Sequence, residues 1–146
     1  MFASATQPHV SQRHAAGAYK QVYAATGVDS ATPHGLIGML FDALVGALAE
    51  ARGALRGGQI AAKGKAIAQA LRIVDEGLCA ALNEAEGGAL AADLRDLYGY
   101  ITLRLTHANL HNDEAALDEC VRLIEPLRSA WAGIADQVAN RPPAAV

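Results

Sequence analysis

Residues 89–110 read ALAADLRDLYGYITLRLTHANL, and this stretch decides the fold. Its large apolar side chains recur every three or four residues, which is the repeat of one face of an α-helix rather than the alternation of a β-strand. The recurring positions are Leu90, Leu94, Leu97, Ile101, Leu105 and Ala108. A second apolar set recurs on the opposite side, at Ala92, Gly99, Leu103 and Leu110. The stretch therefore predicts a helix with two apolar faces.

Helix-start and helix-stop residues divide the preceding part of the chain. Thr32 is placed to cap a helix whose first position is Pro33, where no backbone donor is lost. Gly57 and Gly58 tolerate the left-handed conformation that closes a helix, so we expect this helix to run over about 33–55. A further helix is predicted over about 59–83, followed by a turn at Gly87 and Gly88.

The chain after residue 110 predicts one more helix. Asn112 is expected to cap it, and its apolar positions continue as far as Val138. Pro126 lies inside this pattern and lacks a backbone donor, so we expect a kink or a restart of the helix there. Residues beyond about 139 contain Pro142 and Pro143 and are expected to form a flexible tail.

Composition favours helices throughout. The 146 residues fit a single domain, and 33 alanines stand against 15 valines and isoleucines. Because the connections are short, successive helices should lie side by side and antiparallel. We expect an all-α fold: an antiparallel four-helix bundle with up-down topology, preceded by a short helix over about 15–25. The domain should cover 15–138, with a disordered extension over 1–14 and a flexible C-terminal tail over 139–146.

Charge and cysteine usage narrow the class of function. The net charge of −3 argues against a nucleic-acid partner, which normally meets a basic face. There is no secretory signal pattern, and no stretch approaches the ~20 apolar residues that span a bilayer, so we expect no membrane insertion. Cys79 and Cys120 lack metal-ligand spacing and are expected to be buried free thiols, as in a reducing, cytoplasmic setting.

No convincing catalytic or metal-binding set is present. His107 and His111 share a helix face near Asp113, but the favoured interpretation is a pair of surface histidines near a helix C-terminus. Residues 58–66, GQIAAKGKA, depart from a phosphate loop because the glycine spacing is one residue too long and Ala66 replaces the hydroxyl residue. We therefore expect a protein that is not an enzyme and needs no metal or cofactor.

Three predicted helices carry more apolar surface than one core face requires. In the helix over 33–55 the apolar arc spreads from Met39 and Ala43 to Phe41 and Val45, roughly twice the usual width of about 100°. The helix over 59–83 has a weaker second set at Ala62, Ala66, Ile73, Gly77 and Ala80. These faces either pack on other helices of the same bundle or leave a groove open for another chain.

Four motifs resemble one known family, the flagellin-specific export chaperones called FliS. They are AYKQVYAATG (18–27), TPHGLIGMLFDALVGAL (32–48), EGGALAADLRDLYGYITLRLTHANLHND (86–113) and LRSAWAGI (127–134). The resemblance runs in order over about four fifths of the chain. Phe41 stands where the family usually has tyrosine, which removes a hydroxyl group and keeps the ring.

The resemblance implies a cytoplasmic secretion chaperone. It would bind the disordered C-terminal segment of flagellin, prevent premature polymerisation, and deliver the subunit to the export-gate protein of the flagellar type III apparatus. Tyr19 and Tyr23 would form a movable lid or contact, and Asn109 a polar anchor for the backbone of the bound segment. The expected groove lining is Met39, Ala43, Ile73, Leu103 and Leu110. The alternative function is a small structural bundle that homodimerises through the same apolar faces.

Overall fold

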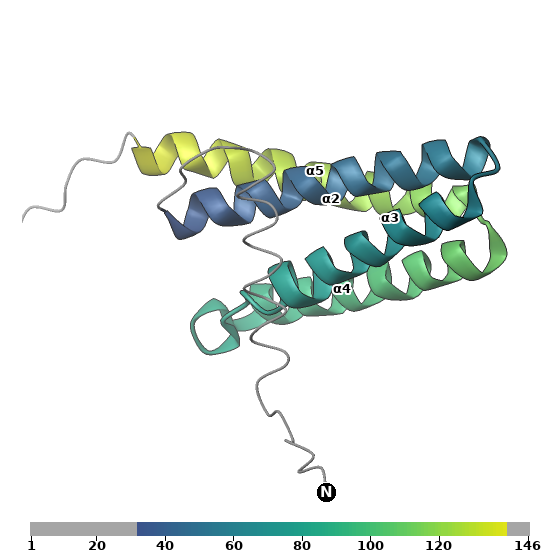
Figure 1. The fold of residues 1–146 in the computed structure, drawn as a ribbon. Coiled ribbons are helices and arrows are strands. Elements are labelled where there is room, and N and C mark those ends of the chain that lie inside the picture. Colours follow the sequence, from purple (N-terminus) through teal and green to yellow (C-terminus); the bar gives the residue numbers. More distant parts are fainter. Residues whose placement is uncertain (1–31, 140–146) are drawn as a thin grey trace, which may run out of the picture.

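The computed structural model describes residues 32–139, with side chains as far as Ile134. Over that range the chain is helical, without a strand, and its elements are α2 (Pro33–Arg56), α3 (Ile60–Arg72), the π-helical η1 (Ile73–Cys79), α4 (Glu84–His111) and α5 (Glu114–Ala139). η1 continues α3 directly, so the described chain makes four helical rods (Figure 1). The predicted extension over 1–14, the short helix over 15–25 and the tail beyond 139 lie outside the described residues.

The ends of α2 follow from its capping residues. Thr32 Oγ1 accepts a hydrogen bond from the Gly35 amide at 3.0 Å, and Pro33 occupies the first turn. At the other end Gly57 closes the helix and Gly58 has a φ of +67°, a conformation that L side chains rarely adopt. The start and stop predicted for this helix are confirmed.

The next rod ends earlier than predicted. It finishes at Cys79 rather than near residue 83, because Asn83 serves the following helix: its side chain accepts a hydrogen bond from the Glu86 amide at 3.3 Å. Within η1, Gly77 lies against α2, where an added Cβ would come within 3.1 Å of Leu40 Cδ1. Glycine at this position therefore lets the two rods approach closely.

α4 begins at Glu84, several residues before the expected start at 89. The predicted glycine turn is present as a break inside it, since Gly88 has φ 54° and ψ −132°. The cap predicted for the last helix is wrong. Asn112 adopts the left-handed conformation that ends α4, and Asp113 caps α5 instead by accepting a hydrogen bond from the Ala116 amide at 3.3 Å.

α5 runs as a single helix through Pro126. Of the two expected outcomes, a restart of the helix at this residue is therefore wrong, and a kink stays a prediction. Pro126 lies on the exposed side of the helix, where water can satisfy the carbonyl group that loses its backbone donor.

α2 and α4 each contact α3, η1 and α5, and α2 packs against these neighbours more extensively than α4 does. Two ion pairs show that α2 and α5 run in opposite directions: Arg52 with Asp118 at 2.9 Å, and Asp42 with Arg128 at 2.6 Å. Figure 1 shows α5 beside α2, and α4 beside α3. The neighbouring helices therefore bury the wide apolar arc of α2.

α2 also meets the length and composition of a membrane-spanning helix, so the expectation that no stretch comes close to one is wrong for this segment. Its Leu40, Leu44 and Leu48 are fully buried among the other helices. A helix with neighbours on two sides of a bundle needs the same apolar composition.

Candidate partner-binding surface

α4 carries a buried face and an uncovered apolar face. Ile101 and Leu105 are fully buried against the core. On the opposite side Leu103 is 70% exposed and Leu110 is 75% exposed. With Ala92 and Gly99, which are also exposed, they form what we call the outer face of α4. No helix of the described chain covers it, so here the second apolar set is left open.

Gly99 makes a shallow trough in this face. A Cβ added at this position would meet no atom within 4 Å, so nothing in the described bundle requires a glycine there. Glycine inside a helix costs roughly 0.5–1 kcal/mol relative to alanine. Beside the large side chain of Leu103, the trough would allow the backbone of another helix to approach.

A polar network holds one edge of the outer face against α5. Glu119 Oε1 accepts hydrogen bonds from the Tyr100 hydroxyl at 2.6 Å and from Arg104 Nε at 3.0 Å. The hydrogen bond from Tyr100 is the main cause that lowers the pKa of Glu119, and the same bond raises the pKa of Tyr100. Glu119 therefore stays ionised and keeps both side chains oriented.

The corner between α4 and α5 is closed by a buried lysine. Lys63 of α3 is only 3% exposed. Its ammonium group donates to the Asn109 carbonyl oxygen at 2.8 Å and to Asn112 Oδ1. This contact ties the first turn of α3 to the last turn of α4.

The two histidines at this corner have local partners. His107 Nε2 lies 3.2 Å from Asp113 Oδ2, and the rings of His107 and His111 have centroids 4.5 Å apart. Among residues 32–134, no three His, Cys, Asp or Glu side chains are grouped so that they could hold a metal ion.

An apolar pocket of about 300 Å³ lies at the other end of the bundle. We call it the end pocket; Leu90, 68% exposed, and Ile134, 43% exposed, belong to its lining. Its other lining residues are Ile37, Phe41, Leu78, Ala81, Leu82, Leu94, Tyr98, Leu127, Ala130 and Trp131. Since a cavity of about 150 Å³ can hold benzene, this volume is enough for one or two large apolar side chains.

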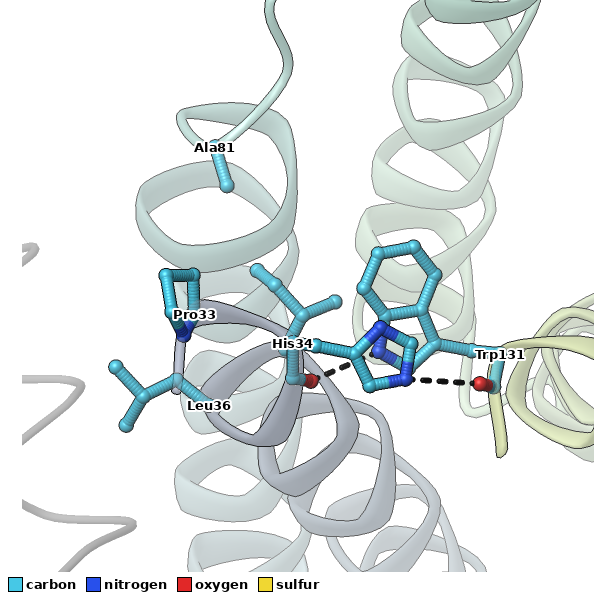
Figure 2. Close-up of a pocket in the computed structure, with 6 residues that line it drawn as sticks. Pro33, His34, Leu36, Ala81 and Trp131 are labelled. Atoms are coloured by element: carbon cyan, nitrogen blue, oxygen red, sulfur yellow. Dashed lines mark hydrogen bonds between the residues drawn. The ribbon is translucent and has the colours of Figure 1, made fainter. Parts of the chain in front are cut away.

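Trp131 of the end pocket also lines a neighbouring pocket together with His34 and Pro33, and Figure 2 shows this second pocket. The rings of His34 and Trp131 are stacked with centroids 4.3 Å apart and planes 8° apart. Trp131 Nε1 donates to the His34 carbonyl oxygen at 2.9 Å, and His34 Nε2 lies 3.1 Å from the Trp131 carbonyl oxygen. The pair fastens the first turn of α2 to α5.

The residues predicted to bind a partner fall into three groups. Leu103 and Leu110 lie together on the outer face, and the neighbouring Asn109 is exposed while its carbonyl group accepts from Lys63. Met39 and Ile73 are buried in the core, and Ala43 is half-buried against it. The structure thus does not bring these three to the outer face.

Two predicted residues, Tyr19 and Tyr23, lie outside the described part of the chain. For all eight predicted residues, a role in partner binding stays a prediction.

Sequence reasoning missed the end pocket, the His34–Trp131 pair and the buried Lys63. His34 and Trp131 are 97 positions apart, so no local periodicity connects them. The available signal was their presence in two of the quoted motifs, TPHGLIGMLFDALVGAL and LRSAWAGI. Lys63 lies within residues 58–66, the stretch that departs from a phosphate loop.

Comparison with protein families matches residues 15–138 to the family described as "Flagellar protein FliS". This chain belongs to the FliS family. It is similar to the flagellar secretion chaperone FliS of Salmonella typhimurium, with 45% identity over 114 residues that cover 78% of this chain and 84% of the relative. The flagellar secretion chaperone FliSB of Pseudomonas aeruginosa is 42% identical over 116 residues, covering 80% and 91%.

The FliS of Escherichia coli, also named a flagellar secretion chaperone, is 34% identical over 114 residues, covering 78% of this chain and 84% of the relative. The resemblance found in the motifs is therefore confirmed. Membership of the FliS family supports a chaperone role in flagellar export. Because these relatives are named as chaperones, they also support the expectation that the chain is not an enzyme.

Proposed function

We propose that this protein is a cytoplasmic chaperone that binds the C-terminal segment of flagellin on the outer face of α4. Holding that segment would prevent premature polymerisation and keep the subunit competent for export by the flagellar type III apparatus. The export-gate protein of that apparatus is the second partner we propose. The family supports the chaperone role, and the flagellin segment and the α4 face are the finer part of the proposal.

The observation that carries the proposal is the exposure of Leu103 and Leu110. Most large apolar side chains of the described bundle are buried or packed against its core, whereas these two are 70% and 75% exposed on one face of one helix. Seven residues separate them, so they are two helical turns, or ~10 Å, apart on the same side. An amphipathic helix of a partner could place its apolar side chains between and beside them.

The helix bundle that carries this face is suited to a chaperone that must stay folded without its partner. We infer that α2, α3 with η1, α4 and α5 alternate in direction as an up-down bundle, which the ion pairs between α2 and α5 support. Such a bundle buries its core without needing the outer face of α4. A disordered segment can then fold onto a rigid surface, although its ordering costs part of the binding free energy.

The end pocket is a second place where the same segment could insert an apolar side chain. Leu90 on its rim and Leu103 on the outer face are 13 residues apart on α4, or ~20 Å along the helix. An extended segment could reach both. Tyr19 and Tyr23, which precede α2 in sequence, remain proposed lid or contact residues, and Met39, Ala43 and Ile73 remain secondary candidates behind this surface.

Leu103→Asp tests the proposal. We expect it to weaken binding of a synthetic flagellin C-terminal peptide at least tenfold, because a carboxylate would be desolvated under the partner. Helicity by circular dichroism should not change, since the wild-type side chain touches solvent. Isothermal titration calorimetry measures the affinity.

The matched control is Ile60→Asp, the same kind of change at an exposed apolar residue at the start of α3. Equal affinity of both variants and the wild type would contradict the proposal. Light scattering separates the alternative function: a chain that dimerises through the outer face and ignores the peptide would favour the structural bundle.

A further inference from the structure

The charge of the buried Lys63 ammonium group does not favour its own helix. It stands in the first turn of α3, where a positive charge is unfavourable to the helix dipole. The side chain is 3% exposed, and its two hydrogen-bond acceptors are neutral oxygens rather than carboxylates. Burying an unpaired cation is costly, so a benefit elsewhere in the fold should offset it.

That benefit falls on the C-terminal end of α4. The Asn109 carbonyl is one of the last four of the helix, which have no partner inside it, and Lys63 Nζ supplies a donor at 2.8 Å. The same ammonium binds Asn112 Oδ1, and Asn112 closes the helix in the left-handed conformation with φ 51°. A cation at this end also meets the negative pole of the α4 dipole.

The two residues bonded to Lys63 flank Leu110. Leu110 is 75% exposed and follows Asn109 directly, two positions before Asn112. A terminal turn without capping partners frays, and Leu110 would then lose its fixed place on the outer face. The lysine thus sits behind the surface, not on it, and holds the turn that presents the exposed leucine.

We propose that Lys63 is a positioning residue for partner binding: it acts through the last turn of α4 to hold Leu110 in the geometry that the partner meets. This inference rests on the proposed function of the outer face. Lys63, although buried in α3, should affect affinity through Leu110 and not through the rest of the outer face.

Lys63→Met keeps an unbranched side chain that is one atom shorter, and it removes the ammonium donors. We expect it to weaken binding of the flagellin C-terminal peptide about five- to tenfold, and to have little further effect in a Leu110→Ala background, because coupled residues are not additive. Lys65→Met is the matched control, since it removes the same charge from an exposed site on the same helix. It should leave the affinity unchanged.

Hydrogen exchange of the free, full-length chain gives a readout that needs no partner. In Lys63→Met the amides of residues 109–113 should exchange faster, while those of residues 98–105 keep their protection. Asn112→Gly retains the left-handed turn and removes only one acceptor. If Lys63→Met fails to fold, Asn112→Gly should show the same exchange pattern and the same coupling to Leu110, both smaller in size.

These experiments distinguish the positioning role of Lys63 from the proposed function of the outer face. Equal weakening by Lys63→Met in the wild-type and Leu110→Ala backgrounds, or lowered stability with unchanged affinity, would overturn the positioning role and leave the proposed function standing. A wild-type chain that does not bind the peptide would overturn the proposed function, and with it the role of Lys63 in binding.

Discussion

Gly99 interrupts the outer face of α4 with a residue that the described bundle does not need. We predict that Gly99→Ala raises the free energy of unfolding by about 0.5–1 kcal/mol, because the added methyl group meets open space and the unfolded chain loses entropy. The same change should weaken binding of the flagellin peptide, since it fills the trough. Urea denaturation and calorimetry measure the two effects.

Gly46→Ala is the control for this prediction. Gly46 is also exposed inside a helix with no atom near an added Cβ, but it lies on α2. It should stabilise the chain similarly and leave affinity unchanged. Equal effects of both variants on affinity would argue against a close approach of the partner at Gly99.

The raised pKa values of Tyr98 and Cys120 predict how the free energy of unfolding depends on pH. Burial raises the pKa of Tyr98 from 10.0 to about 12, with a smaller effect of the charge on Cys79. Burial also raises the pKa of Cys120 from 9.0 to about 11. The folded state holds both protons more tightly than the unfolded state, so this contribution is complete below pH 9 and is lost as pH rises through these two intervals.

We therefore expect the free energy of unfolding to fall between pH 9 and 12, by up to about 3 kcal/mol for each group. Urea denaturation at a series of pH values measures the slope. Cys120→Ala should flatten the lower part of the decline and Tyr98→Phe the upper part. Slopes identical to that of the wild type would show that neither side chain causes it.

At the scale of helices, α5 tolerates a proline in its interior. Pro126→Ala should raise the free energy of unfolding by about 1–3 kcal/mol, because it restores one backbone hydrogen bond and removes a clash one turn back. Thermal and urea denaturation test this. Pro33→Ala at the first turn of α2 is the control and should change stability by less than about 0.5 kcal/mol, since no donor is missing there. A loss of stability in Pro126→Ala would indicate that α5 needs a bend.

Local patterns predicted the helices well where a single residue type decides an end. Thr32 with Pro33, and Gly57 with Gly58, act within a few residues of themselves, and the structure places those ends as expected. Asn112 was assigned to the wrong helix because the same residue type serves as an N-cap and as a left-handed C-terminal residue. Asn112 Oδ1 accepts a hydrogen bond from Lys63, which lies 49 positions away, and no local pattern shows that contact.

At the scale of the whole molecule, periodicity predicted which helix faces are apolar, but not which of these faces other helices cover. Neighbouring helices bury the wide apolar arc of α2 and, from the second set that includes Ile73, the residues Ala66, Ile73 and Gly77. They leave the second apolar set of α4 exposed. That difference follows from the more extensive packing of α2 on its neighbours, which is a property of the tertiary structure. The end pocket likewise joins four segments, so no single stretch could reveal it.

The central claim is that the outer face of α4 contacts the partner. Site-specific photocrosslinking tests it most directly, with p-benzoylphenylalanine placed at Leu103, at Leu110 and, as a control, at the exposed Ala49 on α2. With the flagellin C-terminal peptide, we predict crosslinks from positions 103 and 110 and none from position 49. Crosslinks from position 49 alone, with none from 103 or 110, would contradict the account.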